Sequence, residues 1–105
     1  MTMYKAEVSV DINPPRRVLP FGTRVVLVKV DMHGLLGRDL HPRQEDVGFT
    51  GVIIENSVDD CEGNHQENVR PFKNLTDEES CIYLVISPLG AKLEISDDEL
   101  EVLPG

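Results

Sequence analysis

The sequence predicts an all-β fold: a small barrel of about five strands, an added N-terminal strand and two long loops. Three observations lead to this prediction. Short apolar runs recur along the chain, glycines or prolines separate them, and no heptad or internal repeat is visible. The length of 105 residues suits one domain, in which residues 1–15 form the N-terminal strand and linker and residues 21–103 form the barrel.

The N-terminal segment alternates between apolar and polar residues from Tyr4 to Ile12. A period of two is typical of a strand with one face toward water. Pro14 and Pro15 end this strand, because proline has no backbone N–H to donate to a ladder. Residues 16–21 then connect it to the barrel.

Five runs supply the predicted barrel strands. The turn at residues 87–90 fits type I, with Pro88 at its second position, and it makes the third and fourth strands a hairpin. Ser96 and Glu99 have capping-box spacing, which indicates one helical turn before the last strand. The predicted strands cover residues 24–30, 49–55, 81–86, 92–95 and 101–103.

The central strands carry apolar residues at both alternating positions, so both faces of the sheet are apolar. Something must cover the second face, and the candidates are the N-terminal strand or a second copy of the chain. We expect a symmetric homodimer, the commonest soluble oligomer. The residues expected in the core are Val26, Val28, Val52, Ile54, Ile82, Leu84, Ile86, Ile95 and Leu100.

Net charge is −9 and is unevenly distributed. Residues 1–54 carry 7 basic and 6 acidic side chains, whereas residues 55–105 carry 3 basic and 13 acidic ones. The second half would repel a polyanion, so we expect no nucleic-acid partner. The acid serves solubility, or it forms an acidic face for a basic partner such as a toxin.

No apolar stretch is long enough to span a bilayer, and no apolar signal segment begins the sequence. With only Cys61 and Cys81, the sequence predicts a soluble cytoplasmic protein with free thiols and no membrane partner.

The sequence suggests no metal, cofactor or catalytic residue. Cys61 and His65 are one plausible pair of zinc ligands, but a zinc site needs about four, and His33 and His41 are isolated. Cys61 lies among acidic residues, which oppose formation of a reactive thiolate. The chain is therefore expected not to be an enzyme, although its composition leaves the question open.

The two long loops, residues 31–47 and 56–79, are the expected binding surface at the rim of the barrel, because binding residues concentrate on loops of a rigid scaffold. The sequence thus favours a non-catalytic interaction module. The alternatives are an oligomeric small-ligand-binding protein or enzyme with a site at a symmetry axis, and an acidic protein that binds a basic partner. The candidate interaction residues are His33, Leu35, Leu36, Arg38, His41, Asp59, Asp60, Glu62, His65, Arg70 and Phe72.

The order of strands and long loops resembles the Src-homology-3 (SH3)-like small barrel. The run from Gly48 to Val52 looks like the core of the KOW-type motif in ribosomal and transcription-factor barrels, whose basic loops bind RNA. The layout of residues 21–103 is also similar to the plasmid-borne type II dihydrofolate reductases. Small proteins of this kind are frequent on mobile gene cassettes.

The reductase resemblance implies a shared architecture but not the reductase activity. When the chain is aligned on Leu100 and Glu101, the family's catalytic Gln and Tyr positions hold Leu93 and Ile95.

Overall fold

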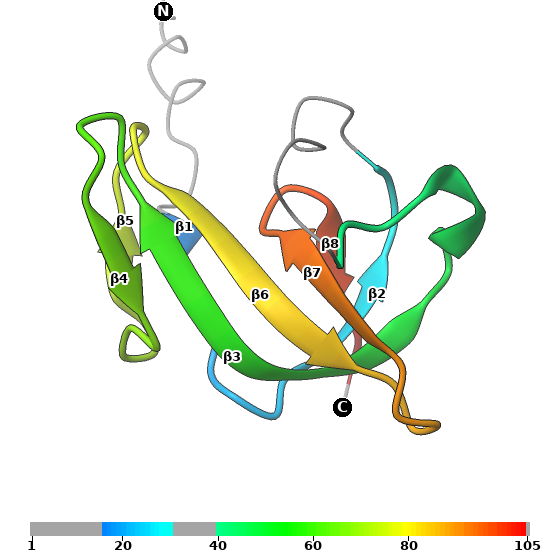
Figure 1. The fold of residues 1–105 in the computed structure, drawn as a ribbon. Helices are drawn as coiled ribbons and strands as arrows, with labels where there is room; N and C mark the ends of the chain where they lie inside the picture. The colour runs from blue at the N-terminus through cyan, green and yellow to red at the C-terminus, as the bar shows by residue number, and fades with distance from the viewer. Residues whose placement is uncertain (1–15, 31–39, 105) are drawn as a thin grey trace, which may run out of the picture.

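The computed structural model describes residues 16–30 and 40–104, so the predicted N-terminal strand lies outside the described residues. The described chain is all-β, with one short 3-10 helix (Figure 1). Its elements are β1 (Arg16–Arg17), β2 (Arg24–Leu27), η3 (Gln44–Asp46), β3 (Thr50–Asp59), β4 (His65–Glu67), β5 (Asn74–Leu75), β6 (Ser80–Ile86), β7 (Lys92–Ser96) and β8 (Leu100–Val102).

The main sheet is antiparallel and has the order β7-β6-β3-β2-β8. The long strand β3 runs through the whole sheet. Its first part pairs with β2, and its last part pairs with β4. β4 and β5 accordingly lie at the opposite end of β3 from β2 and β8 (Figure 1). Within the described residues β7 and β8 do not pair with each other, so the predicted barrel is not closed.

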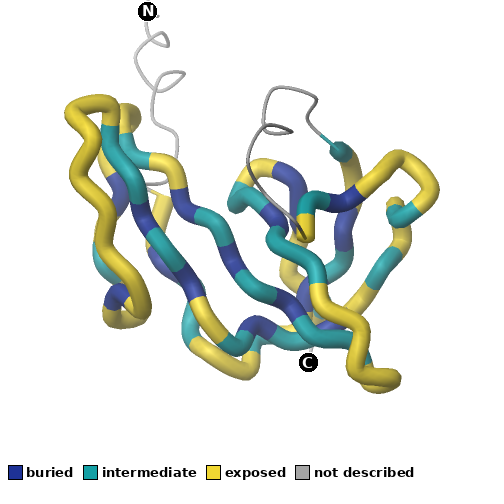
Figure 2. The backbone as a smooth tube through the Cα atoms, viewed as in Figure 1, coloured by how far each residue is buried: buried dark blue, intermediate teal, exposed yellow. Residues whose placement is uncertain are grey.

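The core lies on one face of this sheet. Figure 2 shows buried residues alternating with half-buried ones along β6. The fully buried side chains of β2, β3 and β6 are those of Val25, Leu27, Ile53, Cys81, Tyr83 and Val85.

The predicted core is therefore wrong for the three central strands. Ile95 and Leu100 are buried as expected, and Val28 is 37% exposed. The other expected core residues, Val26, Val52, Ile54, Ile82, Leu84 and Ile86, are only half-buried.

Side chains from outside the central strands decide which face is buried. Val18, Val69 and Leu75 come from segments that the sequence predicted as connector and loop, and all three pack in the core. The hydroxyl of Tyr83 also accepts a hydrogen bond from the backbone N–H of Leu19 at 2.9 Å, which fixes this face of β6 toward the connector. The opposite face has no such cover among the described residues.

The segment 56–79 contains more structure than the sequence predicted. β3 continues to Asp59 through an irregularity between Ile53 and Glu55, and β4 then pairs back onto it. Asn56 is buried, and its side-chain amide exchanges two hydrogen bonds with the backbone of Val69, at 2.7 and 3.0 Å. A side chain thus replaces a strand partner where β4 ends.

The predicted pair of Ser96 and Glu99 is hydrogen-bonded, and Thr76 and Glu79 form the same arrangement. The carboxylate of Glu99 accepts from the Ser96 N–H at 2.9 Å, and that of Glu79 accepts from the Thr76 N–H at 2.9 Å. The return bonds run from each Glu N–H to the carbonyl of its partner. They close tight turns rather than helices, and the Ser96 turn leads directly into β8.

Candidate functional site

The face of the sheet opposite the core, here called the open face, is apolar and half exposed. Residues directly opposite each other in an antiparallel pair share a face. Val52 lies opposite Ile86, and Ser57 lies opposite Ile82, so these side chains lie on the face away from Tyr83 and Val85. Contiguous apolar surface that nothing covers is typical of an interaction site.

One end of the open face forms a shallow cleft of about 170 Å³ between β3, β4, β6 and β7. Its apolar part consists of Ile82 and Leu84 of β6. Glu55 lies directly opposite Leu84 on one side, and Glu94 lies opposite it on the other, so the two carboxylates flank one aliphatic side chain. Glu67 completes the acidic rim.

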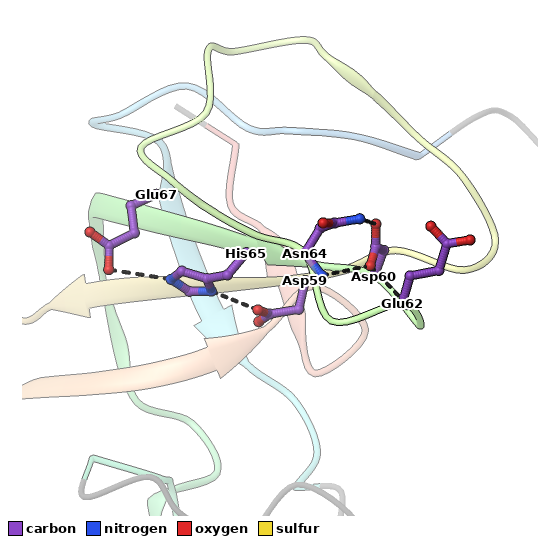
Figure 3. Close-up of polar contacts among 6 residues, drawn as sticks. All are labelled: Asp59, Asp60, Glu62, Asn64, His65 and Glu67. Carbon is purple, nitrogen blue, oxygen red and sulfur yellow. Dashed lines mark hydrogen bonds and ion pairs between the residues drawn. The ribbon is translucent and has the colours of Figure 1, made fainter.

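His65 is the one basic group that lines this cleft within residues 16–30 and 40–104. Figure 3 shows its ring between two carboxylates: Nδ1 lies 2.6 Å from Asp59 Oδ1, and Nε2 lies 3.3 Å from Glu67 Oε2. A neutral imidazole has only one N–H, so the arrangement fits the protonated ring, in which both nitrogens donate. The hydrogen bond with Asp59, and then that with Glu67, raises the pKa of His65 above 6.5.

The turn between β3 and β4 is held by Asp60. Its carboxylate accepts from the backbone N–H groups of Glu62 and Asn64 and from the Asn64 side chain, each at 2.9 Å (Figure 3). The Asn64 bonds lower the pKa of Asp60. Asp60 is therefore a turn residue, and it places Asp59 and His65 on facing strands in direct register.

The structure brings together only part of the predicted interaction surface. Asp59 contacts His65, which lines the cleft, while Glu62 lies exposed in the turn. The remaining described candidates are elsewhere: His41 is half-buried against Pro42, and Arg70 and Phe72 are exposed in the connection to β5. His33, Leu35, Leu36 and Arg38 lie outside the described residues.

A second cleft, of about 260 Å³, lies where β1 approaches β8. Arg16 Nη1 bonds Asp97 Oδ2 at 2.7 Å, and its other nitrogen donates to the carbonyls of Thr76 and Glu79. Burial raises the pKa of Asp97 despite the Arg16 charge. Because all of these groups join β1 to its neighbours, the contacts serve to hold the connector on the sheet.

The two thiols lie in different surroundings. Burial raises the pKa of Cys81 to about 11, so this thiol stays protonated at neutral pH. Cys61 is exposed. Across the described ranges, no three His, Cys, Asp or Glu side chains form a group that could hold a metal ion. No helix in this part of the chain is long and apolar enough to cross a membrane.

Sequence reasoning did not place Glu55, Glu67, Glu94, Ile82 and Leu84 in one site. Its only signal for them was the excess of apolar residues on both faces, together with the acidic second half of the chain. Searches for similar proteins found no matching family model, curated protein or solved structure.

Proposed function

We propose that this chain is a non-catalytic protein-interaction module and that its binding surface is the open face of the sheet. The observation that carries the proposal is the cleft on this face, in which half-exposed Ile82 and Leu84 are flanked by polar groups. A surface with an apolar centre and a polar rim is the usual anatomy of a protein interface.

The proposal moves the binding surface from the rim loops to the strands. Strands hold side chains more firmly than loops, and β3 and β6 pair along almost their whole length. The β3–β4 turn keeps a role at the border of the surface, because it positions His65 opposite Asp59.

The test is chemical-shift mapping on the ¹⁵N-labelled full chain with three short probe peptides. All three carry valine and a test residue two positions apart, with serine between them, so that both side chains share one face of the extended peptide. The test residue is lysine, glutamate or serine. The proposal expects saturable shifts in β3, β6 and β7 with at least one peptide. Shifts confined to the turn 60–64 and the connection 68–73, or no shifts with any peptide, would overturn it.

A matched pair of variants sharpens the test. Leu84→Ser removes the apolar centre of the cleft, whereas Leu89→Ser removes an apolar side chain that is 96% exposed in the β6–β7 turn. The first substitution is expected to abolish the shifts, and the second is expected to leave them unchanged. Equal effects of the two would contradict a site on the open face.

A further inference from the structure

The charges of the open face indicate what kind of partner it fits. Glu55, Glu67 and Glu94 rim the cleft, and no lysine or arginine of the described residues lines it. Lys92 lies opposite Ile86, at the other end of the face, and Arg24 lies opposite Val52. The open face is therefore acidic at the β4 end and carries its basic groups at the β2 end.

An acidic rim around an aliphatic centre complements a segment that carries both kinds of group. An aliphatic side chain of the partner would cover Leu84, and neighbouring ammonium or guanidinium groups would reach Glu55 and Glu94 on either side. Opposite charges across an interface favour the right partner and disfavour acidic ones. The net charge of −9 would also draw a basic partner toward the protein from a distance.

His65 already fills the place of such a cation. Its two ring nitrogens contact Asp59 and Glu67, so the protonated ring neutralises carboxylates that would otherwise face the partner. All three side chains are about half exposed or more, so a partner can reach them. Asp59 and Glu67 contact the ring, and Glu55 and Glu94 line the same cleft. The turn between Asp59 and His65 carries the titratable groups of Asp60, Cys61 and Glu62.

We propose that the open face binds a basic segment in which lysine or arginine lies two positions from an aliphatic residue, so that both side chains share one face of the extended segment, and that protonated His65 competes with this segment. The inference rests on the proposed function. Binding then tightens as the pH rises and His65 loses its proton, because Asp59 and Glu67 become available to the cations of the partner. Lysine and arginine stay charged over this range, so the change comes from the protein.

The experiment measures the affinity of the same three peptides, with acetylated and amidated ends, by fluorescence anisotropy and shift mapping. The lysine peptide is expected to bind more tightly than the serine peptide and to weaken with salt, while the glutamate peptide does not bind. Equal, salt-independent binding of the lysine and serine peptides would overturn this inference and leave the proposed function standing. Binding by none would overturn both.

Two triple variants of equal net charge locate the effect. Glu55→Gln, Glu67→Gln and Glu94→Gln together should weaken the lysine peptide about tenfold, since each exposed pair contributes modestly. Glu45→Gln, Asp77→Asn and Glu78→Gln together, all exposed and away from the cleft, should change the affinity less than about threefold. Equal losses would show a long-range charge effect only and would overturn the site.

The last arm concerns His65. In the wild type, the affinity for the lysine peptide should rise about threefold as pH passes upward through the titration of His65. In His65→Gln the affinity should be higher at low pH and nearly constant. A pH profile that His65→Gln leaves unchanged would overturn the competition.

Open-face shifts that appear on concentrating the protein without peptide would identify a second copy as the occupant and overturn the basic partner.

Discussion

The two faces of the central strands carry the same kinds of side chain but differ in cover. On the core face, Leu27 and Ile53 are fully buried in a core that also contains Val18 and Leu75. On the open face, Ile82 and Leu84 remain half exposed beside charged groups. The difference shows that apolar residues at both alternating positions give a sheet with two apolar faces. Which face becomes the core depends on short segments far away in the sequence that pack against it.

The largest expected effect separates the two faces directly. Leu27→Ala should destabilise the protein by about 2–5 kcal/mol, because it leaves a cavity in a fully buried site. Leu84→Ala removes the same atoms from the open face and should cost no more than about 1 kcal/mol. Urea unfolding monitored by circular dichroism measures both. Equal losses would mean that Leu84 is covered in solution.

These faces also mark how far the sequence predicts the structure. The predicted strands 81–86 and 92–95 match β6 and β7 to within one residue, because both are bounded by turn signals. The choice of face was not predictable, since Val26 and Leu27 differ little as apolar residues. Tyr83 offered the one hint, since a buried aromatic hydroxyl needs a partner, but that partner, the Leu19 N–H, lies far away in sequence.

The candidate site was less predictable than the fold. β4 consists of His65, Gln66 and Glu67, which carry no apolar signal, and it forms because the Asp60 turn folds it back onto β3. The cleft combines residues of β3, β4, β6 and β7, which become neighbours only because of the order of the strands in the sheet. The acidic second half of the chain was visible in the sequence, but the spacing could not show that Glu55 and Glu94 flank the same leucine.

The next effect tests the buried hydrogen bonds of Asn56, which lies on the core face just after the irregularity in β3. Asn56→Ala should cost about 1–3 kcal/mol, because the buried N–H and carbonyl of Val69 lose their partner. Gln66→Ala, which removes an exposed amide from β4, should change stability by less than about 0.5 kcal/mol. The comparison is made by urea unfolding, and a neutral Asn56→Ala would show that water can replace the amide.

A smaller effect is expected at the polar anchor of the core face. Tyr83→Phe keeps the ring and removes the hydroxyl, which accepts from the Leu19 N–H and also bonds the Cys81 thiol, so it should cost about 0.5–1.5 kcal/mol. The loss should be accompanied by faster amide exchange at Leu19, measured by NMR. Unchanged exchange at Leu19 would indicate that the other bonds of the connector, those of Arg16 and Val18, hold it without the Tyr83 hydroxyl.

The smallest effect concerns the polar edge of the open face and depends on pH. Because the folded-state pKa of His65 is raised above 6.5, its pairs with Asp59 and Glu67 stabilise the protein fully below pH 6.5. This contribution is lost as pH rises through the raised pKa. His65→Gln should therefore lower the urea midpoint slightly at acidic pH and leave it unchanged well above that pKa.

Asp59→Asn provides the control, because it removes the largest cause of the shift and should bring the NMR-titrated pKa of His65 back toward 6.5. If that pKa does not move, the Asp59 contact does not form in solution, and the proposed competition at the open face loses its basis.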